Sequence, residues 1–165
     1  MVSTVFDAVR TLTPKRHNWR ICVRIARMWN MTARQGHGDT SSLELVLQDV
    51  HGDCVHASVR SVFVHRHDKH LEEGTVVDVS NFAVAPATGS YRPTEHLYRV
   101  NFQFGTVVRP RKDDQSIPRY GFGFKTFSDI LSSDFDDRFL FDVVGRVSSM
   151  GQLEQRVDIE LTNEG

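Results

Sequence analysis

Arginine and aromatic side chains are the residues of this sequence whose types and spacing could do chemistry. Tyr91 and Arg92 stand side by side in GSYRPT, a turn-prone stretch between two strand-like segments. A planar guanidinium can pair with a phosphate and stack on a base, and an aromatic ring is a further stacking surface. Trp29 ends another arginine-containing segment. Each ring also has a structural interpretation, Tyr91 as a plug over the end of the domain and Trp29 as a cap on the core.

Positive charge is concentrated in the first two-thirds of the chain. The 165 residues contain 20 Lys and Arg against 21 Asp and Glu, a net charge of −1. Residues 1–110 contain 13 basic and 10 acidic residues, a net of +3, whereas residues 111–165 contain 7 and 11, a net of −4. The basic excess is mostly arginine: Arg20, Arg24, Arg27, Arg34, Arg60, Arg66, Arg92, Arg99 and Arg109. We therefore expect residues 1–110 to bind a polyanion.

The other reactive side chains predict neither an enzyme nor a metal or cofactor site. Residues 65–70, HRHDKH, hold three histidines around an aspartate, but positions i and i+2 lie on different faces of a helix and no cysteine pair accompanies them. His56 and His96 have no positioned nucleophile with which to form a triad. Paired carboxylates, a phosphate-binding loop and a nucleophile elbow are missing from the sequence.

Composition places the chain among ordinary globular proteins. It is 39% hydrophobic and 25% charged, and its length suits one domain or a domain with part of another. It contains no run of about 18 apolar residues, so we expect no membrane span. The N-terminus lacks the layout of a secretory signal, and Cys22 and Cys54 are too few for a disulfide framework, which suits a reducing compartment.

The elements that must position these residues follow from hydrophobic periodicity. Alternating apolar residues predict five strands, and a near-helical spacing followed by Gly74 predicts a helix between the third and the fourth. The predicted strands are 19–29, 42–49, 54–60, 75–84 and 96–104, and the predicted helix is 61–74. Five strands with a helix in this place are the plan of an all-β OB-fold barrel. Its two longest loops, 30–41 and 85–95, would flank the ligand groove.

The C-terminal part predicts an incomplete second barrel. Residues 139–151 and 157–165 repeat the pattern of the first two strands, an alternating strand, a Gly- and Ser-containing loop and a second strand. We therefore expect an OB domain over residues 1–110, a linker or connector over 111–138, and the first hairpin of a second OB domain over 139–165. A lone hairpin is marginally stable, so it would dock on the first barrel or be poorly ordered.

The sequence resembles the large, DNA-binding subunit of replication protein A, in its first OB domain. More narrowly, it is similar to the expanded plant group of that subunit, which includes copies carried by Helitron-type transposons. The segments that carry the resemblance are NWRICVRIARMW, SLELVLQDVHGDCVHASV, EEGTVVDVSNFAV, TGSYRPTEHLYRVNFQF and IPRYGFGF. The resemblance covers nearly the whole chain, and its most distinctive motif is the one around GSYRPT.

The resemblance implies sequence-tolerant binding of single-stranded DNA, in a nuclear protein of DNA replication, repair or recombination that can assemble with other replication protein A subunits. Tyr91 falls where the family has a stacking aromatic. Arg60 stands where the family has a second aromatic, and His56 replaces a basic residue earlier on the same strand. The expected nucleic-acid-binding residues are Arg24, Arg27, Trp29, Arg34, His56, Arg60, Tyr91, Arg92, Arg99 and Asn101.

Two alternatives remain open from the sequence. The same groove could hold an acidic peptide or another subunit, an interpretation that the near-neutral net charge and Arg60 favour. The chain could also be a weakly active fragment derived from a transposon. Arg24 and Arg99 have, in addition, the ordinary interpretation of solvated charges on a strand face.

Overall fold

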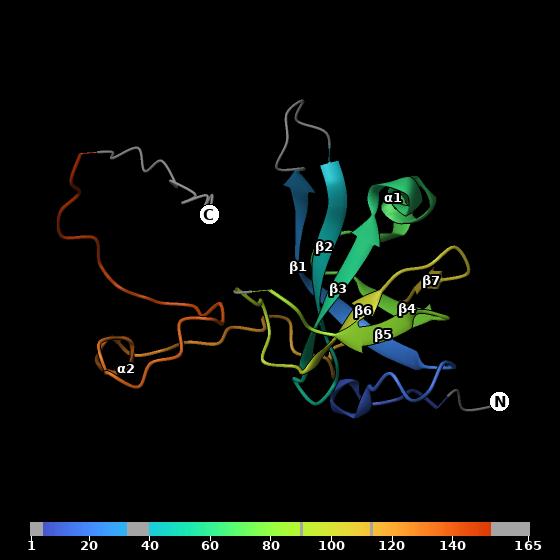
Figure 1. Ribbon diagram of the computed structural model, residues 1–165, viewed down its shortest axis with the longest axis horizontal. Helices are drawn as coiled ribbons and strands as arrows, with labels where there is room; N and C mark the ends of the chain where they lie inside the picture. The colour runs from blue at the N-terminus through green and yellow to red at the C-terminus, as the bar shows by residue number, and fades with distance from the viewer. Residues whose placement is uncertain (1–4, 33–39, 90, 113, 153–165) are drawn as a thin grey trace, which may run out of the picture.

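A seven-stranded sheet forms the body of the protein (Figure 1). The structure is a computed structural model that describes residues 5–32, 40–89, 91–112 and 114–152. The strands are β1 Arg20–Thr32, β2 Thr40–Gln48, β3 Cys54–Arg60, β4 Val76–Ser80, β5 Ala83–Pro86, β6 Tyr98–Asn101 and β7 Val107–Pro110. They lie in the order β5-β6-β3-β2-β1-β4-β7, and every neighbouring pair is antiparallel except β3 and β6. This is an OB fold.

The core lies on the inner face of the curved sheet, where the apolar residues of the alternating segments meet. Ile21, Val23 and Ile25 of β1 are fully buried, as are Leu45 and Leu47 of β2. Successive residues of a strand point to opposite faces, so this alternation places the intervening polar residues on the outer face. The expected alternation of buried and less buried residues is confirmed in β3. In β1 it holds only as far as Val23, because Arg24 and Ala26 are buried as well.

The described residues form seven strands where the sequence predicts five. The expected strand 75–84 is divided into β4 and β5 because Asn81 adopts a positive φ of 57°, which breaks the ladder. The carbonyl of Asn81 accepts a hydrogen bond from the Thr106 hydroxyl at 2.9 Å, which holds this bend against the next turn. β7 is the additional strand, and it pairs with β4 at the edge of the sheet.

The expected helix between the third and fourth strands is present but shorter. α1 covers Ser61–His67, a 3-10 turn η2 follows over Asp68–His70, and α1 packs against β2 and β3. His67 is buried with its ring edge-on to Phe102, the ring centroids 5.5 Å apart, and burial lowers the pKa of the imidazole. Among the described residues, no helix is both long enough and apolar enough to cross a membrane.

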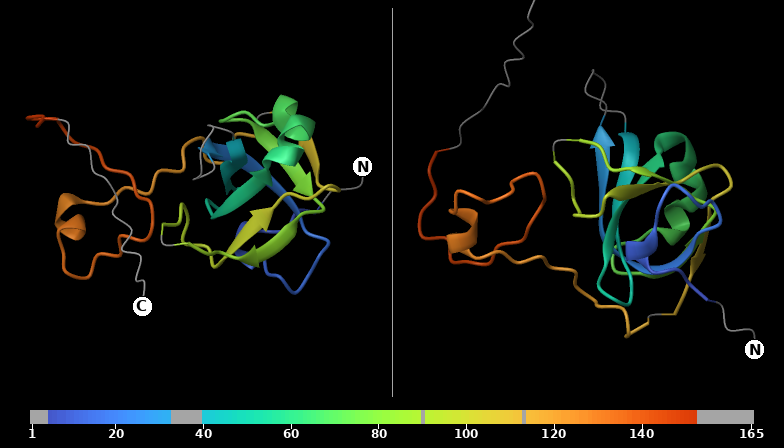
Figure 2. Two further views of the ribbon diagram at one scale, coloured as in Figure 1. Left: turned by 45° about the horizontal axis from the view of Figure 1, so that its top comes forward. Right: turned by 60° about the horizontal axis from the view of Figure 1, so that its bottom comes forward.

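Residues 114–152 leave the sheet as an arm that carries the short helix α2, Phe127–Ile130 (Figures 1 and 2). Within residues 139–152 the structure has no strand, only isolated bridges of Phe139 with Arg92 and of Asp142 with Phe124. The second expected strand of this hairpin, 157–165, lies outside the described residues. At the other end of the chain, a 3-10 turn, η1 Val9–Thr11, precedes the sheet.

Candidate nucleic-acid interface

Strand register brings aromatic and polar side chains together on the outer face of the sheet. Trp29 of β1 pairs with Glu44 of β2, Glu44 pairs with Ser58 of β3, and Ser58 pairs with Asn101 of β6. Paired residues of neighbouring strands point to the same side of a sheet. These four side chains therefore form one row across β1, β2, β3 and β6.

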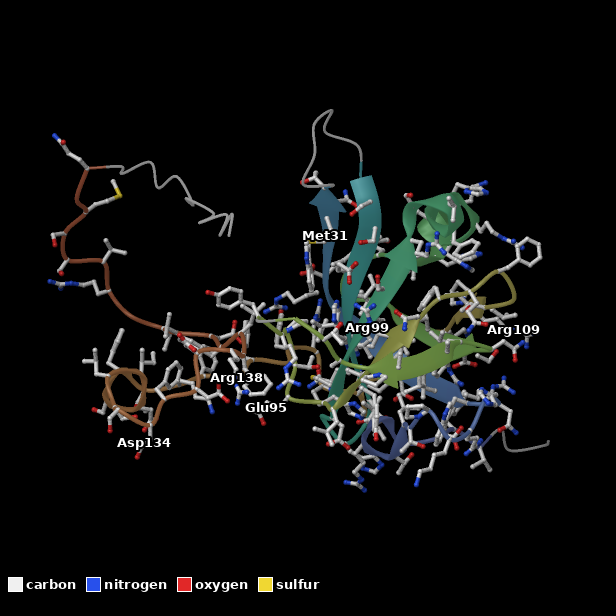
Figure 3. All side chains as sticks on the ribbon, viewed as in Figure 1. Met31, Glu95, Arg99, Arg109, Asp134 and Arg138 are labelled. Atoms are coloured by element: carbon white, nitrogen blue, oxygen red, sulfur yellow. The ribbon has the colours of Figure 1, made fainter. Side chains whose placement is uncertain are left out.

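A second row lies beside the first and carries most of the positive charge. Arg27 pairs with Val46, and Val46 pairs with His56. Arg99 stands two residues before Asn101 in β6, so it points to the same side, and Figure 3 shows it near the middle of the sheet. We call this surface the groove face: Arg27, Trp29, Glu44, Val46, His56, Ser58, Arg60, Arg99 and Asn101.

A β-bulge in β1 explains why Trp29 belongs to the groove face and not to the core. Residues 21, 23 and 25 point inward, so unbroken alternation would also point residue 29 inward. The register shifts between Ile25 and Arg27, which inserts one extra residue and reverses the alternation that follows. Met28 then packs against the core, while Arg27 and Trp29 point outward.

Glu44 is the centre of a hydrogen-bond network on the groove face. Its carboxylate accepts bonds from the hydroxyls of Ser42 and Ser58, the latter at 2.8 Å, and lies 2.6 Å from Nε2 of His56. Burial raises the pKa of Glu44, but the hydrogen bonds from His56, Ser42 and Ser58 outweigh it and hold the pKa below its usual value. Glu44 is only 7% exposed and ionised at neutral pH.

Two rings on the groove face are arranged in parallel. The indole of Trp29 and the imidazole of His56 lie 6.0 Å apart between centroids, with an angle of 9° between their planes. Trp29 is half-buried, which leaves part of the indole surface open. Arg60 is exposed at the end of β3, and its partner in the register is Ser42.

A cavity of about 900 Å³ opens beside the groove face. Arg27, Trp29 and Val46 belong to both. The rest of its lining comes from Arg10, from two further residues of β1, from residues 52–54 between β2 and β3 and at the start of β3, from residues 93–96 and from the arm near Gly121 and Phe141. The volume falls within the range of ordinary ligand sites, so the cavity can accept groups the size of a nucleotide.

The loop between β5 and β6 presents Tyr91 and holds Arg92. Tyr91 is 77% exposed, so it does not plug the end of the domain. Arg92 is half-buried, its guanidinium lies 4.5 Å from the centroid of the Phe139 ring, and its backbone bonds Arg138 and Leu140. The labelled Glu95 and Arg138 mark where the loop meets the arm (Figure 3).

His96 fixes the end of this loop. Its Nδ1 lies 3.0 Å from the Tyr98 backbone nitrogen and 2.9 Å from the Tyr98 carbonyl oxygen. Its Nε2 lies within hydrogen-bond distance of the Val9 carbonyl, at 3.0 Å. The ring therefore ties the loop to the segment that precedes β1.

The structure gives Arg24 a structural role and removes it from the interface. Arg24 is only 3% exposed. Its guanidinium donates to the Gly74 carbonyl at 2.7 Å and to the carbonyls of Asp114, Ile117 and Pro118 at 3.1 Å each. These bonds hold the beginning of the arm against β1. Of the other expected site residues, Arg34 lies outside the described residues, and Arg27, Trp29, His56, Arg60, Arg99 and Asn101 share the groove face.

Sequence reasoning missed Glu44 and the contact of residues 120–124 with the groove face. In the sequence Glu44 is simply one residue of a predicted strand. The residues that could have indicated its role are Ser42, Ser58 and His56, which form its hydrogen bonds. The arm segment 120–124 covers part of the interface, with the Phe122 ring centroid 5.2 Å from the Arg27 guanidinium. The alternation of glycine and aromatic residues permits this approach, since a Cβ on Gly121 would lie 3.0 Å from the Gln48 side chain.

An OB-fold module with an aromatic and arginine-rich face is the class of protein that the fold and the site define. The model of a family described as "Domain of unknown function DUF223" matches residues 10–133. The chain belongs to this family.

The comparisons also confirm the resemblance to the large subunit of replication protein A. The chain is 26% identical over 147 residues to a 70 kDa DNA-binding subunit of replication protein A from Arabidopsis thaliana, covering 87% of this chain and 17% of the relative. It is 24% identical over 144 residues to replication factor A protein 1 of Saccharomyces cerevisiae, covering 87% and 23%. The chain thus spans about a fifth of the length of these relatives.

A solved structure shows the same fold. A chain of a replication protein A heterotrimer bound to ssDNA superposes with a TM-score of 0.60 at 19% identity, covering 76% of this chain and 29% of that chain.

Proposed function

We propose that this chain is a single-stranded DNA-binding module that binds with little sequence preference. The observation that carries the proposal is the groove face itself, where Trp29 and His56 lie among Arg27, Arg60 and Arg99 beside a cavity. Relatives named as DNA-binding subunits support it. Bases would stack on the open part of Trp29 and on Tyr91, and the arginines would pair with the phosphates.

The contributions of the two kinds of contact differ. Stacking of one base on an aromatic side chain contributes about 1–3 kcal/mol and tolerates any base, because every base has a π-face. Arginine–phosphate contacts add affinity that falls as the salt concentration rises. Arg60 can stack on a base or pair with a phosphate, since its guanidinium is exposed and planar. Arg92 contributes to binding indirectly, by holding the loop that presents Tyr91, because its guanidinium lies over the Phe139 ring.

We assign the binding domain to residues 1–110, a connector to 111–138 and the start of a second OB domain to 139–165. The sheet, which ends at Pro110, supports the first boundary. At the level of the whole protein we propose a nuclear role in DNA replication, repair or recombination, together with other replication protein A subunits. The names of the relatives support this proposal.

A second candidate function is binding of a protein partner. The observation that favours it is the row of exposed aromatics on the arm, Tyr120, Phe122 and Phe124, which are 63%, 47% and 55% exposed. Apolar rings exposed in a row are a feature of protein interaction sites. A partner could bind them while the groove face holds DNA or in place of it.

Tyr91→Ala tests the DNA-binding proposal by fluorescence anisotropy with an oligo-dT. Loss of one stacked base predicts about tenfold weaker binding, within the range of about 1–3 kcal/mol for one stack. Phe104→Ala is the matched control, because Phe104 is 72% exposed at the turn between β6 and β7 and lies against Arg66 of α1, which is not part of the groove face. Equal losses in the two variants, or no binding by the unmodified protein at low salt, would exclude the proposed site.

A further inference from the structure

A buried carboxylate on a face that binds a polyanion requires an explanation. Glu44 stands in the central row of the groove face, between Trp29 and Ser58. Its charge opposes the binding of phosphates, so it does not serve the arginine–phosphate contacts. Three side chains nevertheless hold this carboxylate in one position.

The network determines which nitrogen of His56 carries the proton. An ionised carboxylate has no proton and only accepts hydrogen bonds. Nε2 of His56, 2.6 Å from Glu44 Oε2, must therefore be the donor. In the neutral ring the other nitrogen, Nδ1, is then an acceptor.

Nδ1 of His56 is free for a ligand. Among the described residues, Nδ1 has no hydrogen-bond partner. It is also not fully buried, so a ligand can reach it. The parallel indole of Trp29 and the bond to Glu44 together fix the plane of the imidazole. The groove face thus presents a fixed acceptor next to a stacking surface.

We propose that Glu44 makes His56 a reader of nucleobases, so that the groove face prefers bases with an amino donor at pyrimidine position 4 or purine position 6, cytosine and adenine, over bases with a carbonyl oxygen at position 4, uracil and thymine. This inference rests on the proposed DNA-binding function and refines it. Cytosine has an N4 amino donor where uracil and thymine have the O4 acceptor. An acceptor placed opposite O4 leaves both groups unpaired, which weakens binding. Glu44 is a positioning residue, and His56 makes the contact.

Oligo-dC and oligo-dU of equal length test the preference by anisotropy at mildly alkaline pH, where cytosine is unprotonated. The two pyrimidines differ in the group at position 4 and in the proton on N3, and neither has a methyl group. We expect the unmodified protein to bind oligo-dC about three- to tenfold more tightly, the gain from one net hydrogen bond. Equal affinities, or tighter binding of oligo-dU, overturn the inference. Failure to bind either strand overturns the proposed function instead.

Glu44→Gln tests whether the carboxylate sets the preference. The hydroxyls of Ser42 and Ser58 donate to the carboxylate now, so the amide oxygen takes their bonds and the amide NH₂ faces His56. Nε2 of His56 then accepts, and the proton moves to Nδ1. The ratio of the two affinities should fall to one or below. In Tyr91→Ala both affinities fall and the ratio is retained. A Glu44→Gln variant that binds but keeps the oligo-dC preference contradicts the inference.

Nitrogen chemical shifts of the imidazole provide a measurement that needs no variant. In the ¹⁵N-labelled protein without DNA we expect His56 to carry its proton on Nε2. A proton on Nδ1 of the neutral ring would overturn the proposed mechanism.

Discussion

Replacement of Arg24 by methionine tests whether this arginine stabilises the fold and does not bind DNA. The guanidinium of Arg24 donates four hydrogen bonds to backbone carbonyls, three of them to Asp114, Ile117 and Pro118 at the beginning of the arm. Methionine retains much of the apolar stem but removes every donor. A hydrogen bond from a charged group contributes about 1.5–3 kcal/mol, and the four bonds of one side chain do not add independently. We expect the free energy of unfolding to fall by about 3–4 kcal/mol.

Urea denaturation followed by circular dichroism measures this loss, and Arg27→Met is the matched control. Arg27 lies on the same strand, but among the described residues its guanidinium donates only to the neighbouring Ala26 carbonyl. Arg27→Met should unfold close to the unmodified protein and bind oligo-dT more weakly. Arg24→Met should show the opposite pattern, with affinity retained while it is folded. A loss of stability below about 1 kcal/mol in Arg24→Met, with weakened DNA binding, would refute the structural role.

Two further predictions follow from pKa shifts. Because the pKa of Glu44 is lower in the folded protein than in the unfolded chain, its stabilising contribution is present above the unfolded pKa and is lost as the pH falls through the folded pKa. Unfolding measured between neutral pH and strongly acidic pH should therefore show a smaller acid-induced loss in Glu44→Gln, and an identical loss in both proteins would contradict this. Burial raises the pKa of Cys22 and of Cys54 to about 11, so both thiols should react slowly with iodoacetamide at neutral pH until urea unfolds the protein. Rapid labelling of the folded protein would show that the thiols are not protected.

Much of the fold could be predicted because the strands alternate strictly. β3 has the expected bounds, Cys54–Arg60, and the helix follows it directly. The division of the fourth strand could not be predicted, because asparagine at 81 tolerates a positive φ without requiring it. β7 was missed because four residues ending in a proline give a weak strand pattern, and its pairing with β4 is non-local.

The sequence names most of the residues of the groove face but not the contacts that they make. Arg24 looks like its neighbours in the sequence, and its carbonyl partners at 114–118 lie about 90 residues away. Trp29 points outward only because of a β-bulge that the sequence pattern does not predict. The sequence alone indicates an ordinary charged residue on a strand face at Glu44. Only the strand register places it beside His56 and Ser58. In each case the deciding contact comes from another strand or from the arm.

The salt dependence of oligo-dT binding tests the central claim most directly. Each phosphate contact on a single strand lowers the slope of log K against log salt by about 0.7, so three contacts from Arg27, Arg60 and Arg99 predict a slope of about −2. Binding that weakens with this slope supports single-stranded DNA as the ligand of the groove face. No measurable binding at low salt, or an affinity independent of salt, would contradict it.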